Sequence, residues 1–525
     1  MIGFRTIDKP VFLFINTFYM GWMIFILGTV GFHAGLYLLF QKAKTEAWKA
    51  LVPVYNTWIM VELMQIRKRW FWLQFIPVVG QFITISLVID FVKHFGKFTL
   101  WEHALVVFLP FAYLPWLGYA KDTRFIGPEG VKLYKKSGIR EWVDAAVFAI
   151  VAATIIRTFV FEAYTIPTPS MEKSLLVNDF LFVSKMSYGP RIPNTPLSFP
   201  FVHHTLPITG GKSYLEWIKW PYKRIIGSPV KRNDVVVFNL PVGDTVINDE
   251  VNYGSRVTYY EAIRQAGGDR QKVWDEFGPI IITRPVDKRE NFIKRCVAIA
   301  GDTLEIRNGI VYINGKLNDI PPGLESNYLL ETKGQPLNME DLKESYDISE
   351  EEGEVRHLGG NQYEIFLTKN QVAEFSKLSY VQSLMPVNFL YQNCPPGLGG
   401  VDIFPNDTAY AKWTIDNYGP LYIPKQGATI ALNAETYPRY ERVIRAYEGN
   451  QFEQQNGKYL LNGKEVTSYT FKQNYYWLMG DNRHNSLDSR YWGFVPEDHV
   501  VGKASLIFFS YENGPRWKRI FRLIK

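Results

Sequence analysis

The stretch AAVFAIVAATIIRTFVF, residues 145–161, is apolar except for Arg157, and the texture of the sequence changes directly after it. Its 17 residues reach the lower limit for a helix that crosses the hydrocarbon core of a bilayer. From residue 163 onward, short alternating apolar runs are separated by Gly, Pro, Asn and Asp, which is typical of strands and turns. We therefore expect a transmembrane helix over 141–162 that leads into a mostly β domain.

Three further runs without Asp, Glu, Lys or Arg precede this helix. They are Val11–Phe40, Trp70–Ile89 and Ala104–Ala120, with 30, 20 and 17 residues. Prolines such as Pro110 count against some of these spans, because proline removes a backbone donor and kinks a helix. Val11–Phe40 is too long for a cleaved signal peptide, so we expect it to be retained. The sequence predicts about four spans, three of them in an N-terminal membrane region over 1–140.

The loops between these runs carry the basic residues. Arg67, Lys68 and Arg69 precede the second run, and Lys and Arg recur throughout residues 121–140. Basic loops stay on the cytoplasmic side of a membrane. This orientation places everything after Glu162 on the outer side.

The second half of the chain predicts a β framework with two insertions. Strands are expected at Ile310–Ile313 and Tyr475–Met479, among others, and Asn308-Gly309 is a two-residue hairpin signal. The framework covers 163–316 and 471–512, with an insertion at 242–290, an inserted α/β subdomain at 317–470 and a basic tail at 513–525. The fold class is thus a multi-span α-helical membrane region followed by a mostly β domain with an α/β insertion.

Composition argues against several classes of protein. The net charge of +7 is spread along the chain and beside apolar segments, which suits a lipid headgroup surface better than nucleic acid. Cys296 and Cys394 are the only cysteines. They are too few for a disulfide framework and lack zinc-site spacing, and whether they are free or bridged stays open.

Two clusters carry residues suited to nucleophilic catalysis. Ser170 follows Glu162 by eight residues, so even an extended chain keeps it within about 28 Å of the expected span. Lys294 and Arg295 stand beside a strongly apolar run. A lysine in such surroundings loses hydration of its charged form and can act as a neutral base. Taken separately, the first cluster also fits a plain linker and the second a solvated strand edge.

A third cluster, GDNRHNSLDSRYWGFVP at residues 480–496, is the densest in polar side chains. It follows directly after an expected apolar strand. A loop with so many donors and acceptors can satisfy many buried hydrogen bonds at once, as the support of a functional site requires.

Together these clusters resemble the motif boxes of bacterial type I signal peptidases, in the same order and with the first box just after a membrane span. The resemblance implies a serine endopeptidase that removes N-terminal signal peptides from exported preproteins after small residues of the Ala-x-Ala type. It implies Ser170 as nucleophile and Lys294 as general base. The supporting residues that it implies are Thr168 in the oxyanion hole, Ser486 orienting the lysine amine, and Asp488, Arg490 and Arg295 in an ion network.

The resemblance also implies the setting. The expected location is the cytoplasmic (inner) membrane, multi-pass, with the catalytic domain on the periplasmic side. The expected partners are preproteins that bear signal peptides, the lipid bilayer and the protein export machinery, with no nucleic acid, cofactor or metal. The sequence departs from the family pattern where Lys173 replaces a proline after the nucleophile, and where Ala298 and Ala300 replace turn residues after the base.

Two alternatives stay open. One is a membrane-tethered binding or assembly protein with a decayed protease site. The other is a Ser/His/Asp hydrolase, although Ser170 lacks a Gly-x-Ser-x-Gly elbow and no histidine has an obvious acidic partner in the pattern. The histidines considered for it are His203, His204, His357, His484 and His499.

Overall fold

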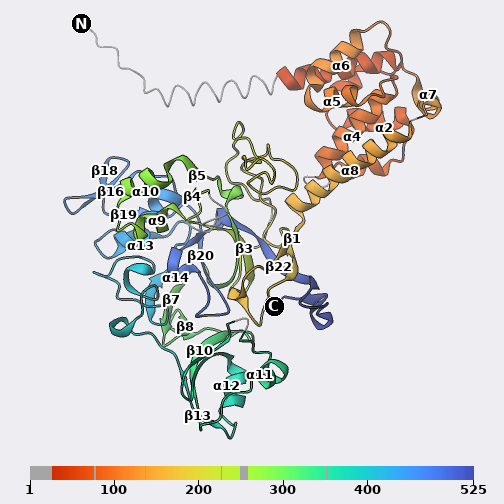
Figure 1. Cartoon of the computed structure of the whole chain (residues 1–525). Coiled ribbons are helices and arrows are strands. Elements are labelled where there is room, and N and C mark those ends of the chain that lie inside the picture. Colours follow the sequence, from red (N-terminus) through yellow and green to blue (C-terminus); the bar gives the residue numbers. More distant parts are fainter. Residues whose placement is uncertain are drawn as a thin grey trace, which may run out of the picture. The chain divides into compact units, whose positions relative to one another are not determined.

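The computed structural model describes residues 27–75, 79–135, 137–225, 227–248, 258–350 and 353–524. The chain forms two compact units, Met1–Val151 and Ala152–Lys525 (Figure 1). Of the expected span Val11–Phe40, residues 11–26 lie outside the described part, and residues 27–42 form one helix.

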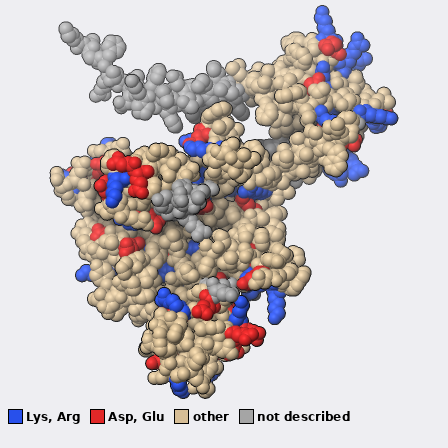
Figure 2. Space-filling model, in the orientation of Figure 1, with Lys and Arg blue, Asp and Glu red and all other residues tan. Residues whose placement is uncertain are grey.

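The N-terminal unit is helical. Its core contains fully buried side chains such as Leu36, Phe40, Phe91 and Leu114. Outside this core, Trp101 is 82% exposed, and wide uncharged areas separate the Lys and Arg side chains on the face shown in Figure 2. After the helix at 27–42 come the 3-10 turn η1 (Ala47–Leu51) and the helices α2 (Tyr55–Met64), α3 (Arg69–Leu73), α4 (Val79–Lys93), α5 (Leu100–Phe108), α6 (Pro110–Tyr119), α7 (Gly127–Leu133) and α8 (Gly138–Phe159).

The apolar runs of this unit fold into shorter helices than the sequence predicted. The run Ala104–Ala120 is divided between α5 and α6, because Leu109 leaves the helical conformation and Pro110 begins the next helix. The run Trp70–Ile89 is likewise divided between α3 and α4.

Among the described residues, only α8 is long and apolar enough to cross a membrane. It has 22 residues, none of them buried within the structure. At 1.5 Å per residue it extends about 33 Å, close to the thickness of the hydrocarbon core. The described structure therefore has an N-terminal helical region with one candidate span, and the multi-span arrangement stays a prediction.

The C-terminal unit is mostly β, as predicted. Its largest sheet is antiparallel, in the order β1-β2-β22-β3-β6-β20-β21, with β23 paired to β22. Strand β3 is buried along its whole length, and β20 likewise. The strands are β1 (Phe161–Thr165), β2 (Asp179–Ser184), β3 (Val235–Asn239), β6 (Asn291–Ala298), β20 (Tyr475–Met479), β21 (Val495–Pro496), β22 (Val500–Ser510) and β23 (Arg522–Leu523).

A second sheet continues from the end of β6. Its order is β14-β7-β8-β9. The predicted hairpin at Asn308-Gly309 is confirmed: both residues have positive φ, 51° and 76°, and join β7 to β8. The strands are β7 (Thr303–Arg307), β8 (Ile310–Ile313), β9 (Lys316–Leu317) and β14 (Tyr418–Tyr422).

Between β9 and β14 in the sequence, residues 325–386 form a further body. It has its own hydrophobic core, which includes Leu330, Ile365 and Phe375. In Figure 1 it gathers around the labels β10, β13, α11 and α12. Its sheet has the order β11-β12-β10-β13. Its elements are β10 (Glu325–Thr332), α11 (Met339–Tyr346), β11 (Val355–Gly359), β12 (Gln362–Thr368), α12 (Lys369–Phe375) and β13 (Val381–Pro386).

Small elements complete the unit. The pair β4 (Thr245–Ile247) and β5 (Ile281–Thr283) flanks α9 (Tyr259–Gln265) and α10 (Arg270–Phe277). Before β20 come β15 (Thr429–Ala431), α13 (Thr436–Arg442), β16 (Phe452–Gln455), β17 (Lys458–Leu461), β18 (Lys464–Val466) and β19 (Ser468–Thr470), and α14 (Ser489–Trp492) follows it.

Candidate active site

The structure brings Ser170 and Lys294 together. Ser170 lies in the short 3-10 helix η2 (Pro169–Met171), between β1 and β2, and Lys294 lies on β6 opposite Val236 of β3. The Ser170 Oγ and the Lys294 Nζ are 2.6 Å apart. Both residues are buried, with 8% and 3% of their surface exposed. Among the described residues, the Ser170 hydroxyl has Lys294 as its hydrogen-bond partner.

The loop after β20 holds the backbone of the serine turn. The Asn482 N–H donates to the Ser170 carbonyl at 3.3 Å, and the Asn482 side-chain amide donates to the Pro169 carbonyl at 3.4 Å. At Gly480, an added Cβ would lie 2.5 Å from the Ser170 carbonyl oxygen and 2.2 Å from the Ser486 Oγ. Only glycine therefore permits this close approach.

Arg295, the neighbour of Lys294, forms a buried ion pair with Asp481. The Nε and Nη2 of Arg295 lie 2.8 and 2.6 Å from the two carboxylate oxygens of Asp481. The Ser174 hydroxyl donates to the same carboxylate at 2.6 Å. Asp481 was not among the predicted site residues, although it lies in the dense polar loop. The pairing of β20 with β6 brings Asp481 to Arg295, because it sets Met479 opposite Arg295.

A second buried pair joins Asp488 to Arg490. The Arg490 Nε and Nη2 donate to Asp488 at 2.9 and 2.8 Å, and the Asp488 carboxylate also accepts from the Gly480 N–H at 3.1 Å. Burial alone would raise the pKa of Asp488, but the charge and hydrogen bonds of Arg490 outweigh burial and lower it. Of the three charged residues predicted as one network, Asp488 and Arg490 thus pair with each other, whereas Arg295 pairs with Asp481.

The two hydroxyl groups of the prediction lie close to the serine turn. Thr168 directly precedes η2 in extended conformation and is half-buried. Ser486 is buried beside Gly480, and its Oγ has no hydrogen-bond partner among the described residues.

The departure from the family pattern at Lys173 has a structural reason. Lys173 has a φ of 60°, which a proline cannot adopt. Its Nζ lies 2.6 Å from the Glu354 Oε1, and the Glu354 side chain is 2% exposed. The turn after Ser170 therefore contacts the body formed by β10–β13, which carries Glu354.

The same body places a buried carboxylic acid beside this turn. Glu325 is fully buried, and its N–H donates to the Asp481 carbonyl at 2.9 Å while its own carbonyl accepts from the Arg483 N–H at 3.0 Å. Both of its carboxyl oxygens lack hydrogen-bond partners among the described residues. Burial raises the pKa of Glu325 to about 8, against the opposing charge of Lys173.

Three of the histidines have carboxylate partners, which the sequence pattern did not indicate. They are His204 with Glu290 at 2.8 Å, His484 with Asp416 at 3.1 Å, and His499 with Asp498 at 2.6 Å. The hydroxyl of Ser170 is nevertheless paired with Lys294. Cys296 and Cys394 are both free.

A buried serine hydroxyl beside a buried lysine amine, in an antiparallel β unit that follows a candidate membrane helix, is an arrangement that suits a serine peptidase. The family model described as signal peptidase, peptidase S26, matches residues 139–372 and 421–509. The chain belongs to this family.

Curated relatives extend over most of the chain. A protein named "Signal peptidase I" from Haemophilus influenzae is 23% identical over 404 residues, which cover 76% of this chain and 79% of the relative. Another of that name from Helicobacter pylori is 23% identical over 394 residues, or 72% of this chain and 90% of the relative. In the N-terminal unit, residues 48–128 match a family of unknown function, DUF5684.

Proposed function

We propose that this chain is a signal peptidase I, a membrane-bound serine endopeptidase that cleaves N-terminal signal peptides from exported preproteins after small residues. The observation that carries the proposal is the 2.6 Å approach of the Lys294 Nζ to the Ser170 Oγ in a buried site. Membership of the S26 family supports the same assignment.

In the proposed mechanism, Lys294 is the general base and Ser170 the nucleophile. Burial withdraws water from the ammonium form of Lys294 and favours the neutral amine. The Ser170 Oγ attacks the scissile carbonyl, and the lysine amine takes the proton of the Ser170 hydroxyl at the same time. The resulting oxyanion is held by the Ser170 N–H and the Thr168 hydroxyl. The protonated lysine then gives its proton to the leaving amine, and an acyl-enzyme remains.

Lys294 acts a second time on the acyl-enzyme. Neutral again, it takes a proton from water, whose oxygen attacks the ester carbonyl. The Ser170 oxygen then leaves and takes this proton back from the lysine, and the cleaved signal peptide departs with a new carboxyl group. We propose that Ser486 orients the lysine amine during the reaction, although its Oγ has no hydrogen-bond partner among the described residues in this structure. The Arg295–Asp481 and Asp488–Arg490 pairs keep the loop that supports Ser170 in position.

The location selects the substrate as well. With α8 as a membrane span, Ser170 lies a few residues beyond the bilayer surface. The apolar segment of a signal peptide occupies the same bilayer, so confinement to two dimensions brings its cleavage site to the serine. We place the catalytic unit on the periplasmic side of a cytoplasmic membrane, with the N-terminal unit as a multi-pass region and the export machinery as supplier of preproteins.

The test is cleavage of a preprotein with an Ala-x-Ala site by the detergent-solubilised full chain. We expect cleavage after the second alanine, with loss of activity in both Ser170→Ala and Lys294→Ala. Alanine variants of His203, His357 and His499 serve as controls and should keep the lysine-dependent cleavage. Cleavage by Ser170→Ala and Lys294→Ala at the wild-type rate would refute the mechanism.

A further inference from the structure

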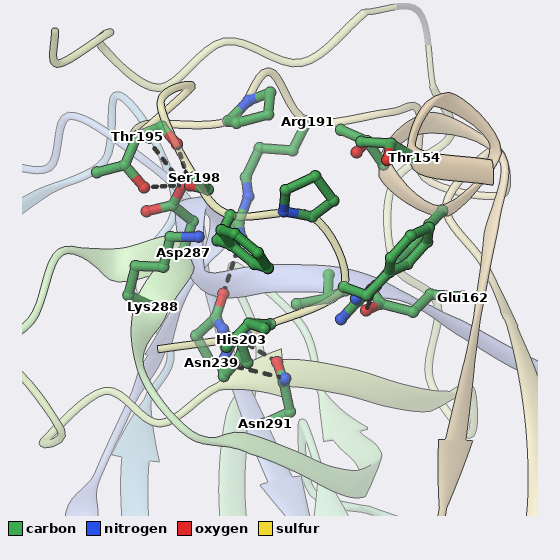
Figure 3. A pocket seen from close by; sticks show the side chains of 18 of the residues that line it. Thr154, Glu162, Arg191, Thr195, Ser198, His203, Asn239, Asp287, Lys288 and Asn291 are labelled. Carbon is green, nitrogen blue, oxygen red and sulfur yellow. Dashed lines mark hydrogen bonds and ion pairs between the residues drawn. The ribbon is translucent and has the colours of Figure 1, made fainter. Parts of the chain in front are cut away.

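A basic pocket lies at the end of α8, on the other side of the main sheet from Lys294. Thr154, Arg157 and Thr158 of α8 contribute to its wall, and so does Asn291 of β6. Because residues three apart on a strand point to opposite faces, Asn291 and Lys294 lie on opposite sides of β6. The cavity measures about 190 Å³, which is room for several water-sized groups. Figure 3 shows Thr154 and Glu162 on one side of this space and Thr195, Asp287 and Lys288 on the other.

The side chains that line the pocket carry an excess of positive charge. Four are cations, Arg157, Lys185, Arg191 and Lys288, and two are carboxylates, Glu162 and Asp287. Glu162 is shared between two of the cations, with Arg157 at 2.6 Å and Lys185 at 2.7 Å. These two charges lower the pKa of Glu162 to about 2 despite its burial, so it is ionised.

The other two cations, Arg191 and Lys288, form no ion pair with a carboxylate of the described residues. The Arg191 guanidinium donates to the Asp498 carbonyl at 2.6 Å and to the Asn239 side-chain oxygen at 2.9 Å. The charges of Arg191 and Lys288 are therefore not neutralised by a direct ion pair and can attract an anion into the pocket.

Lys288 is the cation whose surroundings in the pocket most favour a bound anion. It ends the turn η4 (Val286–Lys288), only 7% of its surface is exposed, and no hydrogen bond or ion pair joins its Nζ to another of the described residues. The Tyr214 ring lies 5.5 Å from the Nζ. Burial lowers the pKa of Lys288, with the charge of Asp287 opposing this effect. Lys288 lines the pocket with no acceptor for its amine among the described residues, and an anion in the pocket would supply that acceptor.

The rim of the pocket points to the source of that anion. Phe199 and Phe201 line the pocket and are 61% and 52% exposed. Further along the same loop, Ile208 is 96% and Trp217 82% exposed. Exposed aromatic and aliphatic side chains next to the end of a membrane-crossing helix are typical of segments that lie in the headgroup region. The pocket and this loop thus occupy the level at which α8 would leave a bilayer.

We propose that the pocket binds the phosphate of an anionic phospholipid headgroup, while the loop over 197–220 lies in the membrane interface around it. Lys288 and Arg191 contact the phosphate. The excess of cations favours anionic over zwitterionic lipid.

The experiment measures lipid-dependent stabilisation of the full chain in detergent. Short-chain phosphatidylglycerol, short-chain phosphatidylcholine and inorganic phosphate are titrated separately, and the melting temperature is followed. Lys288→Met removes the buried amine but keeps its volume. Lys219→Gln is the matched control, because Lys219 lies in the same loop region but pairs with Glu216 on the surface.

Phosphatidylglycerol should raise the melting temperature of wild type and of Lys219→Gln alike, and phosphatidylcholine should do so less. In Lys288→Met the apparent affinity for phosphatidylglycerol should fall about tenfold or more, as loss of one hydrogen bond to a charged group predicts. Its melting temperature without lipid should fall little, since no hydrogen bond or ion pair of the amine with a described residue is lost. An unchanged phosphatidylglycerol response in Lys288→Met would overturn the site. Equal stabilisation by inorganic phosphate at the same concentration would overturn the lipid as its source.

Discussion

Removing one partner of the buried ion pair between Arg295 and Asp481 should destabilise the chain more than breaking a surface pair of the same geometry. Its side chains are 4% and 0% exposed, and Asp481 accepts two hydrogen bonds from Arg295 and one from Ser174. Asp481→Ala leaves the guanidinium buried without its counter-charge, which costs about 3–5 kcal/mol. The lost acceptor of the Ser174 hydroxyl adds about 1 kcal/mol. We expect the free energy of unfolding to fall by at least about 4 kcal/mol, roughly a thousandfold in the equilibrium constant.

The assay is urea unfolding of the full chain in detergent, with Glu305→Ala as the matched control. Arg307 and Glu305 form the same bidentate contact, at 2.7 and 2.6 Å, but the Arg307 side chain is 57% exposed. Water and salt screen such a pair, so its loss should lie within the error of the measurement. If Asp481→Ala destabilises the chain no more than Glu305→Ala does, the supporting role of the buried pair is refuted.

Three further results are expected. Because the pKa of Glu325 is raised to about 8 from a usual 4.5, its stabilising contribution is complete below about pH 4.5 and is lost as the pH rises through about 8. The melting temperature of wild type should therefore drop more between pH 5 and pH 8 than that of Glu325→Gln, and parallel curves would contradict this. Lys173→Gly keeps the positive φ but loses the contact with Glu354, whereas Lys173→Pro forbids that φ. Lys173→Gly should therefore melt at a higher temperature and cleave faster than Lys173→Pro. The opposite order would show that the turn tolerates proline. A maleimide should label the half-buried Cys394 well before the buried Cys296, as peptide mass spectrometry would show, and equal rates would contradict the burial of Cys296.

The local elements of the β unit were within reach of the sequence. Tyr475–Met479 and Ile310–Ile313 are strands with the predicted bounds, because their apolar residues are followed directly by turn residues. The hairpin at Asn308-Gly309 was equally readable, since both residues accept positive φ.

The helical region was less predictable. A run of uncharged residues looks the same whether it forms one spanning helix or two short ones. Ala104–Ala120 divides at Pro110, and only the packing of the resulting helices against the core around Phe91 and Leu114 decides between these outcomes.

The candidate site shows the same division between local and distant information. The resemblance selected Ser170 and Lys294, which lie 124 residues apart in sequence, and the structure places them in contact. Asp481 as the partner of Arg295 depends on which strand pairs with β6. The contact of Lys173 with Glu354 depends on how an inserted body packs against the serine turn. Neither pairing is contained in a local pattern of residues.

The central claim is that Ser170 forms the acyl-enzyme with Lys294 as its base. The most direct measurement is the mass of peptides from the full chain, quenched in acid during turnover of a signal-peptide ester that ends in Ala-x-Ala. An ester acylates readily and allows the intermediate to accumulate. We predict an acyl adduct on the peptide that contains Ser170, absent in Lys294→Met. An adduct on another residue, or one on Ser170 that forms as fast in Lys294→Met, would contradict the account.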